Sequence, residues 1–312
     1  MPWLDCARPK CSQEIKIDCC LESGDSWYLT LNACLAMENS ADQYQHLRTA
    51  SAKELRQLVR ATHYKAHTAG LAPGRLQANI IILPELHALD FMRYCQRNPK
   101  PCPLVGVSET GDPIMHTLGD DIDIRTDVPS YNIYTQGKLS KSCDDIKTLW
   151  QQDHVAFAMG CSFTFEDALT QAGIPIWHIE NNKTVPMYRS SIMTCPAGPF
   201  GGEMVVTMRA IDKERVDEAV AISRQYPLAH GAPVHIGDPT AIGLHDLSKP
   251  EWGDSPPNPG DKIPVFWACG VTPQNALMRA TLPLFISHTP GHMLVTDIDD
   301  QAEVPMYSPV IG

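Results

Sequence analysis

The segment Ala78-Asn-Ile-Ile-Ile-Leu-Pro-Glu85 decides the fold class of this chain. Its apolar run rich in β-branched residues is typical of a buried strand, and proline suits the first turn of a helix. An apolar residue then recurs at every third position, which predicts a helix that packs through one face: Leu86, Leu89, Met92 and Cys95. Asn98-Pro99 stops the pattern, so the segment predicts a strand that leads into a helix.

Strands and helices continue to alternate outward from this unit. Ser51-Ala-Lys-Glu54 has the form of a capping box and predicts a helix start. Further helices are expected at 163–171 and 212–226. Short apolar runs predict strands at 104–107, 155–159, 204–208, 233–236, 264–268 and 293–298, with strands and turns over 122–134. Such alternation indicates the α/β class.

Composition excludes two classes of partner. The chain has 312 residues, and its 36 acidic against 25 basic residues give a net charge of −11. Because Lys and Arg are scattered rather than gathered in a basic stripe, we expect no nucleic-acid partner. The longest apolar runs fall far short of the roughly 18–20 residues that a membrane helix needs, so we expect no membrane partner either.

Eleven cysteines without paired spacing predict a reducing compartment. We expect a cytoplasmic protein, with the mitochondrial matrix as the alternative. Residues 1–43 contain several acids and no apolar signal core, and we interpret them as a variable N-terminal extension. They hold no Cys-x-x-Cys pair, which disfavours a zinc module.

The turn Gly160-Cys-Ser162 places a thiol and a hydroxyl at a predicted helix start. Free amides and the helix dipole there can bind an anion or lower the pKa of Cys161, which would make it a nucleophile. The alternative is a buried structural cysteine beside a capping Ser162. Cys269, in Trp-Ala-Cys-Gly270, is interpreted as part of the core at a strand end.

Histidines gather in two later turns. His235 and His292 are candidates for acid–base work near neutral pH. His288 and His292 have the spacing of a metal pair, but Pro290 and Gly291 between them disfavour the helix that such a pair needs. We predict no metal ligands. The chain has no nucleotide-binding glycine motif, which leaves the cofactor unknown and a divalent metal open.

Two arginines are candidates for binding a carboxylate, because a guanidinium can donate two parallel hydrogen bonds to it. They are Arg125, in Arg-Thr-Asp127, and Arg189, in Val-Pro-Met-Tyr-Arg189. Each can equally form a structural ion pair with a nearby acid.

Read in order, motifs from about residue 50 to 298 resemble those of the hydro-lyase family that includes the animal D-glutamate cyclases. The motifs are Gly70-Leu-Ala-Pro-Gly74, Gln77-Ala-Asn79, Cys95 to Pro103, Arg125 to Pro129, Gly160-Cys-Ser-Phe163, His178-Ile-Glu180, Val185 to Arg189, His230 to Pro239, Trp267 to Gln274, and Gly291-His-Met293 with Val295-Thr-Asp297.

The resemblance implies a three-layer α/β/α larger domain, a smaller two-layer α/β domain and a dehydrating lyase. We expect residues 44–120 plus 215–312 to form the larger domain and 121–214 the smaller one. The implied reaction converts D-glutamate to 5-oxo-D-proline and water, or acts on a related small amino or hydroxy acid. It requires a base for the ammonium group and an acid for the departing oxygen, for which His235 and His292 are the candidates.

The remaining site residues follow from the same motifs. Arg189 or Arg125 would hold a carboxylate, and the amides at the Cys161 turn with Asn79 would stabilise an oxyanion. Ser162 and Tyr188 complete the expected substrate contacts. A cysteine-dependent amidase or hydrolase using Cys161 and a non-catalytic small-acid binding protein stay as alternatives, and a homo-oligomer is left open.

Overall fold

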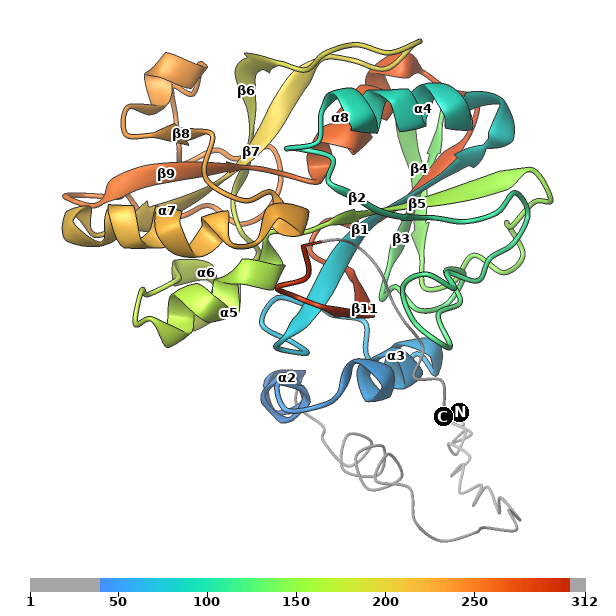
Figure 1. Cartoon of the computed structure of the whole chain (residues 1–312), viewed down its shortest axis with the longest axis horizontal. Helices are drawn as coiled ribbons and strands as arrows, with labels where there is room; N and C mark the ends of the chain where they lie inside the picture. The colour runs from blue at the N-terminus through green and yellow to red at the C-terminus, as the bar shows by residue number, and fades with distance from the viewer. Residues whose placement is uncertain (1–39, 304–312) are drawn as a thin grey trace, which may run out of the picture.

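The structure is a computed structural model that describes residues 40–303, and its strands form two antiparallel sheets (Figure 1). The larger sheet has seven strands in the order β2-β5-β1-β10-β3-β4, with β11 also paired to β1. Its strands are β1 (Arg75–Pro84), β2 (Leu104–Val107), β3 (Tyr131–Thr135), β4 (Lys138–Cys143), β5 (His154–Gly160), β10 (Phe285–His288) and β11 (Leu294–Asp299).

The apolar run from Ala78 to Leu83 is part of the central strand β1. Residues Ala78 to Pro84 pair with β5 on one side. On the other side, Ile81 and Ile82 pair with β10, while Arg75 to Ala78 pair with β11. Ile80 and Ile82 pack in the core on one face of the sheet, and Ile81 packs in the core on the other face. Because both faces are covered, eight consecutive residues of β1 are buried and the run is apolar without alternation.

The smaller sheet has four strands in the order β6-β7-β9-β8. They are β6 (Met187–Met193), β7 (Glu203–Ile211), β8 (His235–Ile236) and β9 (Ile263–Ala268). The predicted strands at 204–208, 264–268 and 293–298 are confirmed as parts of β7, β9 and β11, with longer bounds for β7. β10 was not predicted.

The helices are α2 (Ser40–Leu47), α3 (Ala52–Arg60), α4 (Glu85–Arg97), α5 (Phe163–Gln171), α6 (Trp177–Glu180), α7 (Val216–Arg224) and α8 (Val271–Ala280), with single 3₁₀ turns at Lys213–Arg215, Pro227–Ala229 and Pro239–Ile242. The capping box at Ser51 is confirmed, because its hydroxyl accepts from Glu54 N–H while the Glu54 carboxylate accepts from Ser51 N–H. α8 was not predicted.

Two helices are exchanged between the sheets. α5 follows β5 of the larger sheet, yet its Phe165 packs with Trp267 in the core of the smaller sheet. α8 follows β9 of the smaller sheet, yet its Leu277 packs with Phe157 in the core of the larger sheet. The starts of both helices therefore lie where the two sheets meet.

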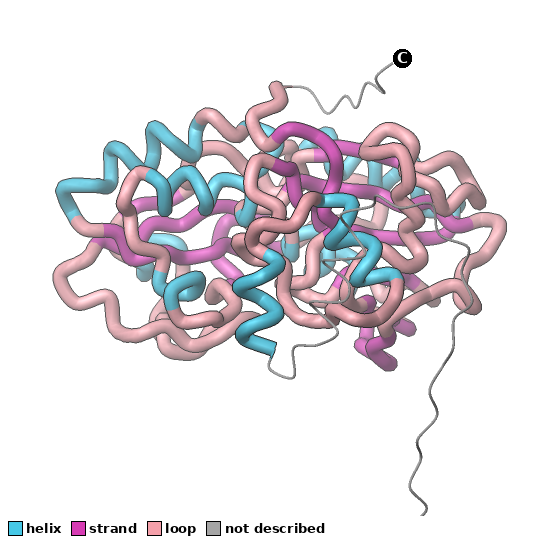
Figure 2. The backbone as a smooth tube through the Cα atoms, turned by 90° about the horizontal axis from the view of Figure 1, so that it is seen from below, coloured by secondary structure: helices cyan, strands magenta, loops and turns pink. Residues whose placement is uncertain are grey.

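Helices cover one face of each sheet. α4 and α8 lie on the larger sheet, and α5 and α7 on the smaller one (Figure 1). The other face of the larger sheet is covered by apolar side chains from loops, among them Leu118 and Ile122. Figure 2 shows how much of the molecule such loops form. The mixed α/β class is confirmed, whereas the three-layer larger domain stays a prediction.

The sheets divide the chain at other positions than the predicted domain boundaries. Strands from 131–160 belong to the larger sheet, and strands from 235–268 belong to the smaller sheet. The apolar face of α4 also differs from the predicted one, because Leu86, Leu89 and Met92 are exposed. Ala88, Phe91, Tyr94 and Cys95 form the buried face instead.

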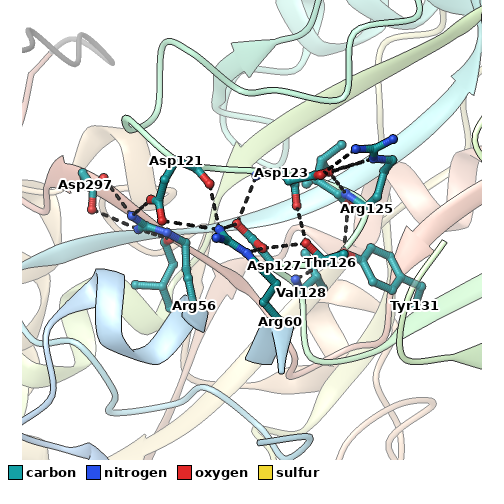
Figure 3. Close-up of polar contacts among 12 residues, drawn as sticks. Arg56, Arg60, Asp121, Asp123, Arg125, Thr126, Asp127, Val128, Tyr131 and Asp297 are labelled. Carbon is teal, nitrogen blue, oxygen red and sulfur yellow. Dashed lines mark hydrogen bonds and ion pairs between the residues drawn. The ribbon is translucent and has the colours of Figure 1, made fainter. Parts of the chain in front are cut away.

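A network of partly buried ion pairs joins α3 to the loop at 121–127 and to β11 (Figure 3). Arg56, 1% exposed, donates to both carboxylate oxygens of Asp297 at 2.9 Å and to Asp121 at 2.6 Å. Arg60 donates to both oxygens of Asp127 at 2.6 and 2.8 Å. Two motifs of the sequence, around Asp127 and Asp297, thus belong to the scaffold.

Most of the predicted N-terminal extension, residues 1–39, lies outside the described part of the chain. Within residues 40–303, no helix combines the length and the apolar character that a membrane crossing requires.

Candidate functional site in the cavity between two helix starts

Four turns that are far apart in the sequence surround one small cavity at the meeting of the sheets. The cavity has about 290 Å³ of empty space, part of it open to solvent. Its lining consists of Asn79, Cys161, Ser162, Phe163, Val185, Met187, Thr207, Cys269, Gly270, Val271, Gly291 and Met293. Three of the predicted site residues, Asn79, Cys161 and Ser162, are brought together here.

Cys161 and Cys269 have the same surroundings. Each follows a central strand and precedes a helix by two residues, and each sulfur accepts a hydrogen bond from the first amide of that helix, Phe163 N–H or Val271 N–H. Burial nevertheless raises the pKa of the Cys161 thiol to about 12 and that of Cys269 to about 11. Both resting side chains are therefore protonated thiols, which weighs against the amidase or hydrolase alternative.

The residues after the two cysteines present free donors. Ser162 and Gly270 precede α5 and α8 directly, and their backbone N–H groups donate to no acceptor within residues 40–303. Such amides at a helix start are suited to a carboxylate or an oxyanion.

Asn79 supplies a free acceptor. Its side chain is 2% exposed and its Nδ2 donates to the Met159 and Gly160 carbonyls, whereas its Oδ1 receives no hydrogen bond from any residue that the structure describes. The side chain lies against Gly270, where an added Cβ would come within 2.0 Å of Asn79 Nδ2. Gly270 is therefore required for the close approach of β1 to α8.

A buried triad of Glu166, His178 and Arg209 supports the polar side chains of the cavity. Glu166 Oε1 accepts from His178 Nε2 at 2.8 Å and from the Arg209 guanidinium. Burial opposes the charge of Glu166, but His178 and Arg209 outweigh it and hold its pKa below the usual range. Arg209 also donates to Ser162 Oγ at 3.1 Å and to Thr207 Oγ1 at 3.0 Å. A guanidinium charge thus lies directly behind two cavity residues.

The other predicted site residues do not line the cavity. Arg125 donates to both oxygens of Asp123, so the carboxylate that it holds belongs to the protein. Tyr188 is buried and donates to the Leu247 carbonyl at 2.7 Å. His235, on β8, lies with Nε2 2.7 Å from the Asp238 carbonyl.

Arg189 and His292 lie closer. Arg189 is two residues beyond Met187 on the same face of β6, and its Nε donates to Asn275 Oδ1 on α8 at 3.2 Å. His292 stands between two lining residues, and burial lowers its pKa, so the imidazole is neutral at pH 7. No group of three or more His, Cys, Asp or Glu side chains within residues 40–303 is arranged to hold a metal ion.

Sequence reasoning missed Arg209, Glu166 and the part that Cys269 plays in the cavity. A shared sequence pattern could have revealed the role of Cys269, because Cys161 and Cys269 are each the first residue of a segment of the form Cys-x-x-Thr-x-x-x-Ala-Leu. A larger hollow, of about 710 Å³, lies beyond Arg209 and His178. It contains neither thiol, and we place the candidate site in the smaller cavity.

Comparison with known proteins identifies the class. The model of the D-glutamate cyclase family matches residues 155–297. Three bacterial proteins named "Putative hydro-lyase" are similar over most of their length. The protein of Dinoroseobacter shibae is 62% identical over 88% of this chain and 92% of its own, that of Ruegeria pomeroyi 60% over 84% and 96%, and that of Rubrobacter xylanophilus 52% over 80% and 96%.

The chain therefore belongs to the hydro-lyase family that includes the D-glutamate cyclases, as the motifs predicted. A solved structure, of the nitrogen repressor-like protein MJ0159 from Methanococcus jannaschii, matches with a TM-score of 0.34 at 10% identity, over 75% of this chain and 91% of that one. This similarity is too low to support an argument.

Proposed function

We propose that this hydro-lyase converts D-glutamate to 5-oxo-D-proline and water, or dehydrates a closely related small amino or hydroxy acid, in the cavity at Cys161 and Cys269. One observation carries the proposal. The cavity offers two free amide donors, at Ser162 and Gly270, beside a free acceptor, Asn79 Oδ1. An α-amino acid presents the complementary groups, a carboxylate and an amine.

The cyclisation uses these groups in one sequence. The amine, positioned by Asn79 Oδ1, attacks the side-chain carboxyl carbon, and the amides of Ser162 and Gly270 stabilise the developing oxyanion. A buried, protonated thiol donates the proton that the departing hydroxyl needs to leave as water. Neutral His292, which stands in the chain between the lining residues Gly291 and Met293, accepts the proton that the amine gives up.

The test is chiral chromatography of 5-oxoproline after incubation with D- or L-glutamate, with and without a divalent metal. Product from D-glutamate alone supports the proposal. Asn79→Ala should lower kcat/KM about 100-fold, the usual scale for one such contact. Arg125→Lys, whose partner is Asp123, is the matched control and should keep its activity. A folded enzyme that forms no 5-oxoproline from either isomer would refute the D-glutamate assignment.

A further inference from the structure

Two segments of the chain repeat one local structure. In the first, β1 and β5 pair in antiparallel orientation, and β5 leads through Cys161 into α5. In the second, β7 and β9 pair in antiparallel orientation, and β9 leads through Cys269 into α8. The register is the same, because the residue before each cysteine, Gly160 or Ala268, lies opposite Ala78 or Val206.

The hydrogen bonds of the two turns repeat as well. Cys161 N–H donates to the Gln77 carbonyl at 2.8 Å, and Cys269 N–H donates to the Val205 carbonyl at 3.0 Å. A threonine stands three residues after each cysteine, and its Oγ1 accepts a hydrogen bond from the N–H of the same strand residue. Thr164 accepts from Gln77 N–H at 3.1 Å. The second threonine accepts from Val205 N–H at 3.0 Å. The two turns are therefore equivalent halves of one arrangement.

The exchange of α5 and α8 brings the equivalent positions together. Both thiols line one cavity, as do the equivalent strand residues Asn79 and Thr207. The two sulfurs also interact electrostatically, so they lie near each other. A small ligand in the cavity is therefore within reach of both thiols.

We infer that Cys161 and Cys269 form an acid–base pair that removes and returns the hydrogen on the α-carbon of the bound amino acid. This inference rests on the proposed function for the binding of an amino acid, and adds proton transfer at carbon to it. Among the residues that line the cavity, the two thiols are the acid–base groups with the most accessible ionisation, since the others are Asn, Ser, Thr, Gly or apolar.

The step balances without an oxidant or a cofactor. One of the two resting thiols first loses its proton to solvent as the substrate binds. The resulting thiolate takes the α-proton, so the C–H bond breaks and an S–H bond forms. The electron pair spreads into the α-carboxylate, which in this step takes the place of the side-chain carboxyl at the free amides of Ser162 and Gly270. The other thiol then donates its proton to the opposite face of the carbon and becomes the thiolate. The product is the inverted α-carbon.

Burial of both sulfurs suits this chemistry. A thiolate formed where burial raises the thiol pKa to about 12 or 11 is a stronger base than one in water. A weakly acidic C–H bond requires such a base. The hydrogen bond that each sulfur accepts from a backbone amide stabilises the thiolate and so allows it to form despite the burial.

Deuterium exchange tests the pair. The enzyme is incubated in deuterium oxide with D-glutamate, L-glutamate, 5-oxo-D-proline and 5-oxo-L-proline, each separately. The α-hydrogen is followed by proton NMR and mass, and the configuration by chiral chromatography. We expect deuterium at the α-carbon of at least one compound. Cys161→Ser and Cys269→Ser should each lower inversion at least about 100-fold, on the scale of lost acid–base catalysis.

The exposed Cys195→Ser is the matched control, and its exchange should stay within about two-fold of that of the parent enzyme. Circular dichroism and thermal unfolding verify that each variant is folded. Exchange that persists in the Cys161→Ser/Cys269→Ser double variant, or no α-deuterium from any of the four compounds, overturns the inference.

The same samples separate this inference from the proposed function. Formation of 5-oxoproline without α-deuterium would overturn the thiol pair and leave the cyclase proposal intact. Deuterium without any 5-oxoproline formed from glutamate would support the thiol pair and refute the cyclase proposal.

Discussion

At the scale of single residues, Gly270 is the position where the cavity tolerates least change. An added Cβ would lie 2.0 Å from Asn79 Nδ2, so Gly270→Ala must displace the Asn79 side chain. We expect this variant to stay folded and to lose about 100-fold in kcat/KM, because Asn79 and the neighbouring amide both move. Steady-state kinetics on the substrate identified by chromatography measures the loss.

Gly201→Ala is the matched control, since its added Cβ would lie 3.2 Å from Pro196 Cβ, outside the cavity lining. Its activity should match that of the parent enzyme. An equal loss in both variants would show that the effect of Gly270→Ala does not come from Asn79.

Two buried histidines should make the stability of the folded chain depend on pH. Burial lowers the pKa of His230 and of His288 to about 4, so both are neutral in the folded chain. The unfolded chain, with ordinary values near 6.5, binds more protons below that pH. The free energy of unfolding should therefore fall as the pH drops from about 6.5 towards 4, by up to about 3 kcal/mol per imidazole.

Urea unfolding at pH 7.5, 6 and 5 measures this dependence. His288→Gln, which carries no proton-binding group, should show a smaller loss of stability between pH 7.5 and 5. His116→Gln, at an exposed position, should keep the slope of the parent chain. Identical slopes in all three proteins would contradict the assignment to His288.

At the scale of elements, α4 shows which apolar residues stabilise the fold. Phe91 is fully buried and its ring lies 4.9 Å from that of Phe157 and 5.4 Å from that of Phe200. Phe91→Ala should lower the free energy of unfolding by about 3–5 kcal/mol, because it leaves a cavity in the core. Leu89, 58% exposed, is the control, and Leu89→Gln should cost less than about 0.5 kcal/mol. Comparable losses would show that the exposed face of α4 is packed in solution.

The sequence alone predicted an element correctly where the local pattern and the tertiary environment favour the same structure. The capping box at Ser51, the buried strand that holds Asn79 and the turn at Cys161 were all predicted and lie where expected. The choice between the two apolar faces of α4 could not be predicted, because both faces have the same helical spacing of three residues. Leu86, Leu89 and Met92 show it on one face, and Ala88, Phe91 and Tyr94 on the other.

α8 was missed for a related reason. Pro273 interrupts its first turn, and proline in a sequence normally ends a helix, although the first turn tolerates it because the amide there needs no partner. Without that helix, the sequence pattern that Cys269 shares with Cys161 does not show that both thiols lie at helix starts. The candidate site thus required the exchange of α5 and α8, which no local pattern encodes.

At the scale of the whole molecule, the network in Figure 3 ties the N-terminal helices to the C-terminal strand. Arg56→Gln would leave the carboxylates of Asp121 and Asp297 without their buried partner. We expect a loss of about 3–5 kcal/mol in the free energy of unfolding, measured by urea denaturation. The exposed pair of Arg93 with Asp90 is the control, and Arg93→Gln should cost less than about 1 kcal/mol. Equal losses in both variants would contradict the role of burial.

The strand order also has a consequence for biosynthesis. β1 is completed by residue 84, but one of its two edges is paired only by β10 and β11, which lie more than 200 residues later. A nascent chain therefore keeps this edge of its central strand open until β10 and β11 have been translated. Open edges of this kind are prone to pair with other chains, so this enzyme depends on rapid closure after release or on a chaperone during synthesis.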